Sequence, residues 1–295
     1  MHRVVLIGST ANETNVRLAE AWSRRGLQVE LLSARAALSE MRPLDVTVGR
    51  LDVLPTLDGV EPGLLELLRL EQQGAVVLNR AWSLLNCHDK LRTARLLGAA
   101  GIPHPRTTVV RAGGQAEVPL PVVVKPRFGS WGADVVRCEA AEELDACLAI
   151  AAQKPWYRRH GALVQEYVPA TGVDLRIVVA AGVVVGAVQR RAPEGDWRTN
   201  TALGGTRHRI SPPAEACALA VAAAHAVGAD VVGVDLLRRA DGTYVVLELN
   251  GAVEFTFEYS LEGRDVYEKT AEALGLVAPR MDDDLPRSVA ESVGA

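Results

Sequence analysis

Two carboxylates and one amide lie on neighbouring predicted strands, in a pattern suited to a metal ion. Asp235 belongs to a strand predicted over 233–238, and Glu248 and Asn250 lie on and just beyond a strand predicted over 244–249. Glu248 and Asn250 are two residues apart, so they face the same side of their strand. A tight turn between the strands allows Asp235 to lie opposite them. Carboxylate and amide oxygens are the ligands that magnesium prefers.

The residues around these acids are strongly apolar. They are Val232, Val234, Leu236, Val245, Val246, Leu247 and Leu249. An acid within a buried strand is costly unless it is paired or bound to a metal. A magnesium site is therefore favoured over the alternative, in which the acids lie on a solvated face of a hairpin.

A lysine followed by a glycine-containing loop forms a second candidate site, Lys125-Pro126-Arg127-Phe128-Gly129-Ser130-Trp131-Gly132. Lysine supplies a compact positive charge for phosphate, and glycines let backbone N–H groups approach phosphate oxygens. The segment is not a Walker motif, because the lysine precedes the glycines. A surface lysine beside a turn explains this segment equally well when it is taken alone.

A third polar stretch contains Gln189-Arg190-Arg191, then Arg198-Thr199-Asn200, then Gly204-Gly205. Arginines in such a position can hold a phosphoryl group or a carboxylate. Taken alone, the stretch is more typical of an exposed basic loop.

These residues must be positioned by alternating strands and helices. The first part of the chain predicts strands over 4–7, 29–32, 46–48 and 75–78 and a helix over 14–25, which indicates a parallel α/β unit. Gly8 follows the first strand, but the GxGxxG spacing of dinucleotide-binding proteins is missing. A dinucleotide-dependent oxidoreductase is therefore disfavoured.

The rest of the chain predicts further elements in the same manner. Helices are expected over 89–100 and 214–227, and strands over 122–125, 162–166, 175–180 and 183–190, in addition to the two that carry the acids. The last residues, 281–295, are polar and predict a flexible tail.

Composition excludes several classes of protein. The net charge of −4 gives no reason to expect nucleic acid as a partner. The four cysteines form no CxxC pair, so neither a zinc site nor a disulfide framework is expected. No signal peptide or membrane-spanning segment is visible, and a cytoplasmic protein without membrane contact is expected.

The order of these motifs resembles the ATP-grasp ligases. The matching segments are Asp89-Lys90, the Lys125 loop, Gln165-Glu166-Tyr167-Val168, Asp174-Leu175-Arg176, Trp197-Arg198-Thr199-Asn200 with Gly204-Gly205, Asp235, and Glu248-Leu249-Asn250. Within the family they are most similar to the RimK/LysX-like branch, which contains the ribosomal-protein glutamate ligase and a ligase of lysine biosynthesis. The resemblance covers about residues 1–277.

The resemblance implies an α/β protein with the ATP-grasp fold, in which ATP lies between two α+β lobes. It implies an N-terminal parallel α/β domain over 1–86, a central lobe with a phosphate lid over 87–165, and a C-terminal lobe with the metal site over 166–280.

The resemblance also implies a role for each site residue. Nucleotide would be bound by Lys90, Lys125, Gly129, Ser130, Gly132, Gln165, Glu166, Tyr167, Val168, Asp174 and Arg176. Arg190, Arg198 and Asn200 would be catalytic, and Asp235, Glu248 and Asn250 would hold two magnesium ions, for which Mn²⁺ is expected to substitute.

The implied activity is an ADP-forming ligase that joins an amino-acid or peptide carboxylate to an amine through an acyl-phosphate. Gly251-Ala252-Val253-Glu254-Phe255 is similar to the LysX branch, which suggests the C-terminal glutamate of a small acidic amino-group carrier protein as one acceptor. Leu203 stands where relatives commonly carry an arginine, so the substrate is left open. A homo-oligomer, dimer or tetramer, is expected. The alternative is a nucleotide-binding regulatory protein that has the same fold but no turnover.

Overall fold

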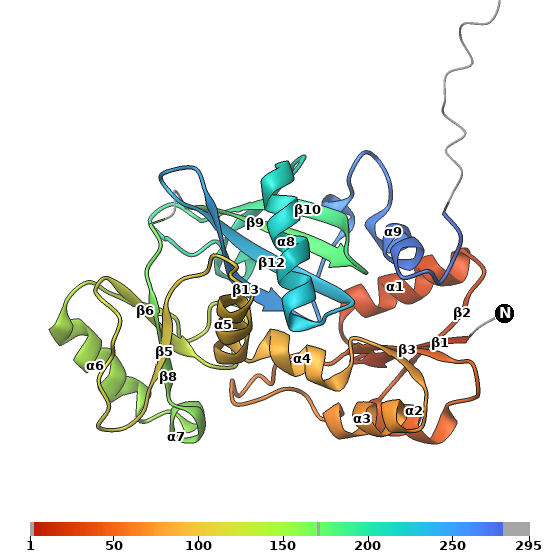
Figure 1. Cartoon of the computed structure of the whole chain (residues 1–295), viewed down its shortest axis with the longest axis horizontal. Coiled ribbons are helices and arrows are strands. Elements are labelled where there is room, and N and C mark those ends of the chain that lie inside the picture. The colour runs from red at the N-terminus through yellow and green to blue at the C-terminus, as the bar shows by residue number, and fades with distance from the viewer. Residues whose placement is uncertain (1–2, 170–171, 280–295) are drawn as a thin grey trace, which may run out of the picture.

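The structure is a computed structural model, which describes residues 3–169 and 172–279. The tail predicted over 281–295 lies outside the described residues. Three sheets follow one another along the chain, and Figure 1 shows them as three blocks, with the C-terminal sheet between the other two. Within the described ranges, no helix has the length and apolar character needed to cross a membrane.

The first sheet is parallel, as predicted. Its strands are β1 (Arg3–Gly8), β2 (Gln28–Leu32), β3 (Val46–Arg50) and β4 (Val76–Leu78), in the order β2-β1-β3-β4. Helices α1 (Glu13–Arg24), α2 (Ala34–Glu40) and α3 (Leu64–Gln72) connect them. The side chain of Asn12 caps α1 by accepting a hydrogen bond from the backbone N–H of Asn15. The strands were predicted, but α2 and α3 were not.

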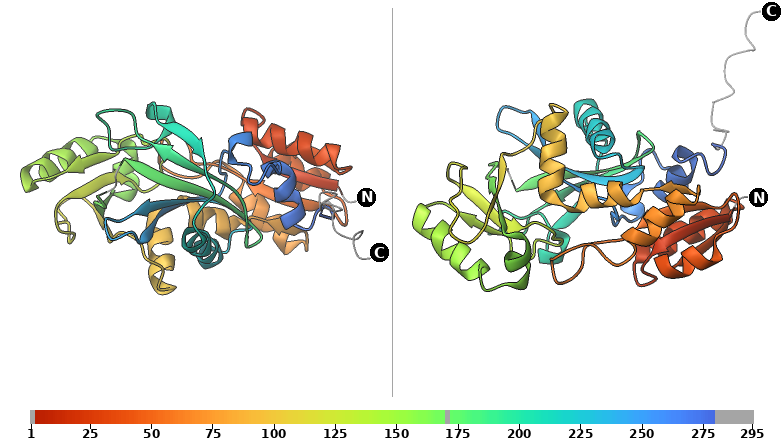
Figure 2. Two further views of the ribbon diagram at one scale, coloured as in Figure 1. Left: turned by 90° about the horizontal axis from the view of Figure 1, so that it is seen from above. Right: turned by 60° about the horizontal axis from the view of Figure 1, so that its bottom comes forward.

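The central sheet is antiparallel. It contains β5 (Thr107–Val110), β6 (Val122–Pro126), β7 (Val136–Cys138) and β8 (Ala162–Glu166), with α6 (Ala141–Ala151) and α7 (Pro155–His160). The views of Figure 2 place this lobe at the end of the molecule remote from the N-terminal domain. The two inner strands were predicted, whereas the edge strands β5 and β7, which are short and mostly half-buried, were not.

The C-terminal sheet is the largest. Its order is β11 (Thr206–Arg209), β10 (Val183–Arg191), β9 (Val173–Ala180), β12 (Val231–Arg238) and β13 (Tyr244–Asn250), and all pairs are antiparallel. The alanine-rich helix α8 (Ala214–Val227) packs on β9, β12 and β13, at the bounds that the sequence predicted. Its small side chains permit a close approach to the sheet.

Two helices connect the N-terminal domain to the lobes. They are α4 (Ala81–His88), which was not predicted, and α5 (Lys90–Ala99), which was. Asp89 ends the first and caps the second, because its carboxylate accepts the N–H groups of Leu91 and Arg92. Arg127 also donates to this carboxylate, at 2.7 Å from Nε to Oδ1, which fixes the start of α5 beside the loop after β6.

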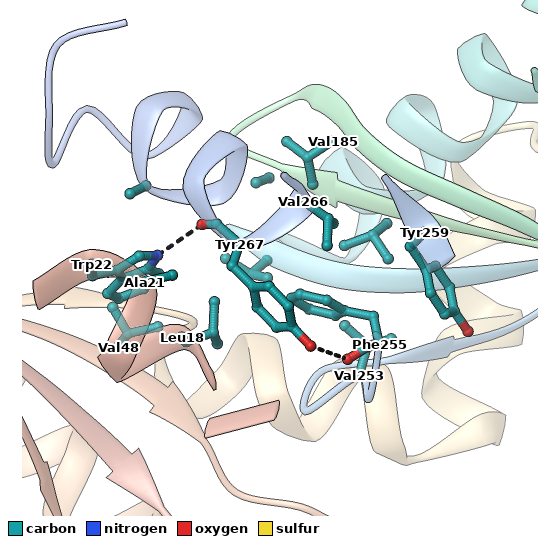
Figure 3. Close-up of a cluster of buried hydrophobic side chains, with 14 of the residues drawn as sticks. Leu18, Ala21, Trp22, Val48, Val185, Val253, Phe255, Tyr259, Val266 and Tyr267 are labelled. Atoms are coloured by element: carbon teal, nitrogen blue, oxygen red, sulfur yellow. Dashed lines mark hydrogen bonds between the residues drawn. The ribbon is translucent and has the colours of Figure 1, made fainter. Parts of the chain in front are cut away.

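A shared core holds the N-terminal domain against the C-terminal sheet and α9 (Val266–Ala273). Figure 3 shows Trp22 of α1 donating a hydrogen bond from Nε1 to the carbonyl oxygen of Tyr267, at 2.9 Å. The hydroxyl of Tyr267 donates to the carbonyl oxygen of Phe255, also at 2.9 Å. The segment that follows β13 is therefore held next to the N-terminal domain.

We propose the units 1–86, 87–165 and 166–280 as the domains of the chain. The three sheets support this division, since β4, β8 and β9 begin and end close to these limits. The first limit falls inside α4, whose last turn belongs with the following lobe in this division.

Candidate active site

A cleft of about 860 Å³ gathers most of the side chains singled out in the sequence; we call it the main cleft. Its lining includes Lys90, Lys125, Gly129, Ser130, Gly132, Gln165, Glu166, Tyr167, Val168, Asp174, Arg190, Arg198, Asn200, Asp235 and Glu248. Two predicted site residues, Arg176 and Asn250, line an adjoining cavity of about 600 Å³ instead. This side cavity shares Ser130, Trp131, Arg190, Asn200 and Glu248 with the main cleft, so the two spaces adjoin.

Two lysines supply positive charge to the main cleft. Lys125 lies on β6, is 5% exposed, and donates from Nζ to Oε1 of Gln165 at 2.8 Å. Burial lowers the pKa of Lys125 to about 8, because the charged form is poorly solvated there. Lys90 at the start of α5 donates from Nζ to the carbonyl oxygen of Gly129 at 2.5 Å and lies 3.4 Å from Oε2 of Glu248. Both ammonium groups are suited to phosphate oxygens.

The glycine loop after β6 packs against the loop that carries Asn200. Trp131 and Gly132 have φ angles of 64° and 75°, the left-handed region. A Cβ atom at Gly132 would lie 2.9 Å from Cδ1 of Leu203 and 3.0 Å from Oδ1 of Asn200. A side chain at this position would press on both neighbours and strain the backbone. Leu203 is part of this loop-to-loop contact.

An aromatic cluster closes one side of the main cleft. The rings of Tyr167 and Trp197 meet edge to face at 5.7 Å, and the guanidinium of Arg137 lies over the Tyr167 ring at 3.9 Å. Such rings can pack against a nucleotide base. Sequence reasoning assigned no role to Trp197 or Arg137. Trp197 stands inside one of the matching motifs, which could have revealed it, whereas nothing in the sequence distinguishes Arg137.

An acid–arginine network forms the base of the cleft. Asp235 on β12 is 1% exposed and accepts hydrogen bonds from Nε and Nη2 of Arg176, both at 2.6 Å, and from Nη2 of Arg190 at 2.9 Å. Burial raises the pKa of Asp235, but the two guanidinium groups outweigh it and hold that pKa well below its usual range. Asp235 is therefore ionised.

The same network fixes Arg190, one of the predicted catalytic residues. Asp174 accepts two hydrogen bonds from Arg190, at 2.8 and 2.5 Å, and one from the hydroxyl of Thr199 at 2.5 Å. Arg198 instead pairs with Asp196, at 2.8 Å from Nη2 to Oδ2, and this hydrogen bonding lowers the pKa of Asp196 to about 2. Arg190 is thus held by two buried carboxylates, whereas Arg198 pairs with one acid that is partly exposed.

The predicted metal ligands are brought together as expected. Asp235 pairs directly with Glu248 in the antiparallel register of β12 and β13, and Asn250 pairs with Gly233 two residues away. This register places the three side chains on the same face of the hairpin. The hairpin thus offers a metal ion two carboxylates and one amide. In the part of the chain that the structure describes, no group of three His, Cys, Asp or Glu side chains could hold a metal ion.

These residues fit a magnesium ion that takes its remaining ligands from phosphates and water. A carboxylate has about four lone-pair sites. The arginines occupy three of those of Asp235, which leaves one for a metal. Glu248 is partly exposed, and Nδ2 of Asn250 is buried with no hydrogen-bond partner among the described residues, so its amide is not committed to another protein group.

Comparison with known proteins identifies the family. The model of the RimK-like ATP-grasp domain matches residues 87–274. A "Probable alpha-L-glutamate ligase" of Aeromonas salmonicida (strain A449) is 33% identical, over 95% of this chain and 98% of the relative. A "Ribosomal protein bS6--L-glutamate ligase" of Shigella boydii serotype 4 (strain Sb227) is 34% identical, over 80% of this chain and 83% of the relative. The chain belongs to the RimK-like ATP-grasp family.

Solved structures show the same fold. A RimK domain ATP-grasp protein from Sphaerobacter thermophilus DSM 20745 superposes with a TM-score of 0.65 at 22% identity, covering 92% of this chain and 99% of that one. D-alanine–D-alanine ligase from Bacillus anthracis, complexed with ATP, gives 0.68 at 17% identity, covering 94% and 97%. The ATP-grasp fold predicted from the sequence is thereby confirmed.

The protein is an ATP-grasp carboxylate–amine ligase, the activity that its relatives define. ATP-grasp ligases bind ATP and magnesium; the ligase PsnB, another solved structure of this fold, was captured with magnesium and ADP. The alternative of a regulatory protein without turnover is disfavoured, since the relatives are ligases and the main cleft keeps its charged residues.

Proposed function

We propose that this ligase joins the amine of an α-amino acid, L-glutamate in the first instance, to a carboxylate at the end of a peptide or protein. The observation that carries the proposal is that the two spaces adjoin: a side cavity with charged walls shares five lining residues with the cleft that contains Lys90 and Lys125. The names of the relatives, which are L-glutamate ligases, support the choice of amino acid.

We assign the roles of the site residues as the sequence predicted them. Lys90 and Lys125 hold the phosphates, the loop from Gly129 to Gly132 covers them, and the segment 165–168 with Asp174 faces the adenosine. Arg190 and Asn200 line both spaces, so Arg190 can offset charge on the transferred phosphoryl group and Asn200 can donate a hydrogen bond to it. Arg198 is proposed to leave Asp196 for that group when ATP is bound. Arg176 is proposed to act through Asp235, because it does not line the main cleft.

The reaction divides into two steps. An oxygen of the acceptor carboxylate bonds to the γ-phosphorus, and the bond from that phosphorus to the β–γ bridging oxygen breaks, so that ADP leaves with the electron pair. The amine nitrogen, after losing one proton, then bonds to the carbonyl carbon. The carbon–oxygen bond to phosphate breaks, phosphate departs, and the nitrogen loses its second proton to solvent.

Magnesium, held by Asp235, Glu248 and Asn250, would supply positive charge to the phosphates during the first step. We propose two ions, with Mn²⁺ able to replace Mg²⁺, because the ligands are all oxygen atoms of a kind that both ions accept. The protein's own part is to keep Asp235 ionised through its two arginines and to hold Glu248 opposite it.

We further propose that the acceptor is a protein tail that ends in an acidic residue, either a ribosomal protein or a small acidic carrier protein. The bS6 ligases among the relatives support the first, and the Glu254-Phe255 segment supports the second. A homo-oligomer in the cytoplasm, without nucleic acid or membrane, completes the proposal.

The test is phosphate release from Mg-ATP with L-glutamate and a peptide ending in glutamate. A matched peptide with an amidated C-terminal residue and an amidated side chain serves as the control, because it has no carboxylate at its end. We expect release only with the free acid, and a product heavier by one glutamate residue. Release with the amidated peptide, or with the acid when L-glutamate is omitted, would contradict the proposed substrates.

A further inference from the structure

The side cavity has charged walls of both signs that the phosphate chemistry does not use. Asp52 follows β3, Glu254 follows β13, and Arg207 lies on β11; all three line the cavity and none lines the main cleft. The carboxyl ends of parallel strands are a common place for ligands. Asp52 stands at that end of the N-terminal sheet. The cavity therefore lies where the N-terminal domain meets the C-terminal lobe.

Among the described residues, no lining arginine forms an ion pair with either carboxylate. The charges of Arg176 and Arg207 reach Glu254 only at longer range. The only ion pair that Asp52 makes among the described residues is with Nδ1 of His88, at 4.0 Å. Burial lowers the pKa of His88, which keeps that ring neutral near pH 7. Oε1 of Glu254 accepts a hydrogen bond from Nδ2 of Asn12 at 3.0 Å, a neutral donor. Burial and, next, the charge of Asp52 raise the pKa of Glu254, as expected for carboxylates that face the same space.

A buried arginine lies beneath these acids but does not fill the cavity. Arg50 is 2% exposed, donates from Nη2 to the carbonyl oxygen of Val253 at 2.7 Å, and has no partner for Nη1 in the described part of the chain. Arg50 does not line the cavity and forms no ion pair with these acids within the described residues, although its charge acts on both. One oxygen of each acid accepts a protein hydrogen bond, which leaves Oδ2 of Asp52 and Oε2 of Glu254 for a ligand.

The opposite sign comes from Arg207. Its Nη2 donates to the hydroxyl of Thr201 at 3.2 Å. Its Nη1 lies 4.0 Å from Oε2 of Glu258, a long ion pair, and its Nε has no hydrogen-bond partner within the described ranges. The side chain is 25% exposed. A guanidinium with free donors is suited to a carboxylate. Apart from Arg176, Arg190 and Glu248, which belong to the proposed phosphate and metal site, the cavity thus presents two acids and one base to a ligand.

We propose that the side cavity binds the amine substrate as a zwitterionic α-amino acid, with its ammonium group at Asp52 and Glu254 and its carboxylate at Arg207. An ammonium group fits better than a metal ion, because no third His, Cys, Asp or Glu completes a metal cluster among the residues described. The proposal rests on the proposed function. It makes the N-terminal domain and the loop after β13 responsible for choosing the amine.

The kinetic test uses Asp52→Asn and Glu254→Gln, with phosphate release measured at varied L-glutamate and varied ATP. Removal of one partner from a desolvated charge pair should raise the KM for L-glutamate about tenfold or more, with the KM for ATP unchanged within about twofold. Glu20→Gln is the matched control, since that acid is 48% exposed, pairs with Arg17 on α1 and lines neither space. If Glu254→Gln fails to fold because its hydrogen bond from Asn12 is lost, Asp52→Asn still tests the idea.

A second readout separates the two charged walls. Glutarate is L-glutamate without its ammonium group. Its inhibition constant should therefore be unchanged in Asp52→Asn and about tenfold higher in Arg207→Gln. The inference would be overturned if the KM for L-glutamate were unchanged in both acid variants. It would also be overturned if the acid variants lost glutarate binding as strongly as Arg207→Gln. Failure of the wild-type protein to release phosphate with any amino acid would refute the proposed function instead, so the two failures are distinguishable.

Discussion

Replacement of Glu248 by glutamine tests the metal-binding hairpin with little disturbance to the fold. Glutamine keeps the length and one oxygen of the side chain but removes its negative charge. The side chain of Glu248 is 18% exposed, and its ion pair with Lys90 is long, at 3.4 Å. Such a partly exposed pair stabilises the fold by about 1 kcal/mol at most. The hydrogen bonds of β13 do not involve the side chain and remain.

The effect on turnover should be much larger. Loss of one group that stabilises transition-state charge typically lowers kcat by about 100- to 1000-fold, which corresponds to about 3–4 kcal/mol. Glu248 lines both spaces and faces Asp235 across the hairpin, so it belongs to this class. The catalytic loss should therefore exceed the loss of stability several times.

The assay compares kcat for phosphate release with the free energy of unfolding in urea. Glu20→Gln is a matched control, because Glu20 also pairs with a basic residue, Arg17 at 3.2 Å, but on the exposed surface of α1. The control should keep wild-type kcat. Wild-type turnover in Glu248→Gln would refute the assignment of Glu248 to the metal, and a loss of turnover matched by unfolding would show that Glu248 acts through stability.

Three further predictions follow from other parts of the site. Because the pKa of Lys125 is lowered to about 8 and bound phosphate favours its charged form, ATP binding at pH 8 should take up about half a proton. Calorimetry in two buffers with different ionisation enthalpies should show this uptake. If the same uptake persisted in Lys125→Arg, another group would be the one that takes up the proton. The pKa of Asp235 is lowered from its ordinary 3.8, so the stability that its ionised form contributes is complete above that pH and is lost as the pH falls below it. The free energy of unfolding in urea should therefore fall more steeply with pH below pH 4 in the wild type than in Asp235→Asn. Equal pH dependence in the two proteins would contradict this. Gly132→Ala should raise the KM for ATP more than Gly113→Ala. Both glycines have a positive φ, 75° and 77°, but only the added Cβ at Gly132 would meet neighbouring atoms. Equal effects would show that backbone strain alone is responsible.

The hairpin of β12 and β13 was the part of the site most completely predictable. Apolar alternation defined both strands, and a period of two placed Glu248 and Asn250 on one face. The sequence did not predict that Arg176 and Arg190 would bind Asp235, because that contact depends on the pairing of β9 with β12 and with β10. Sheet order is a tertiary property that local pattern leaves open.

Elements with weak local signals were missed. Helix α6 (Ala141–Ala151) has no side-chain cap, and the strand β7 (Val136–Cys138) is three residues long. The side cavity was also missed, since Asp52, Arg207 and Glu254 come from distant parts of the chain and belong to no spaced motif. Their meeting depends on how the N-terminal domain packs on the C-terminal lobe.

The measurement that tests the central claim most directly follows an isotope through the reaction. The acceptor peptide is prepared with ¹⁸O in its terminal carboxylate and is incubated with Mg-ATP and L-glutamate. Activation of the carboxylate by phosphorylation predicts that one labelled oxygen appears in phosphate for each amide formed, with ADP as the nucleotide product. Unlabelled phosphate, or label transferred to AMP, would contradict the account.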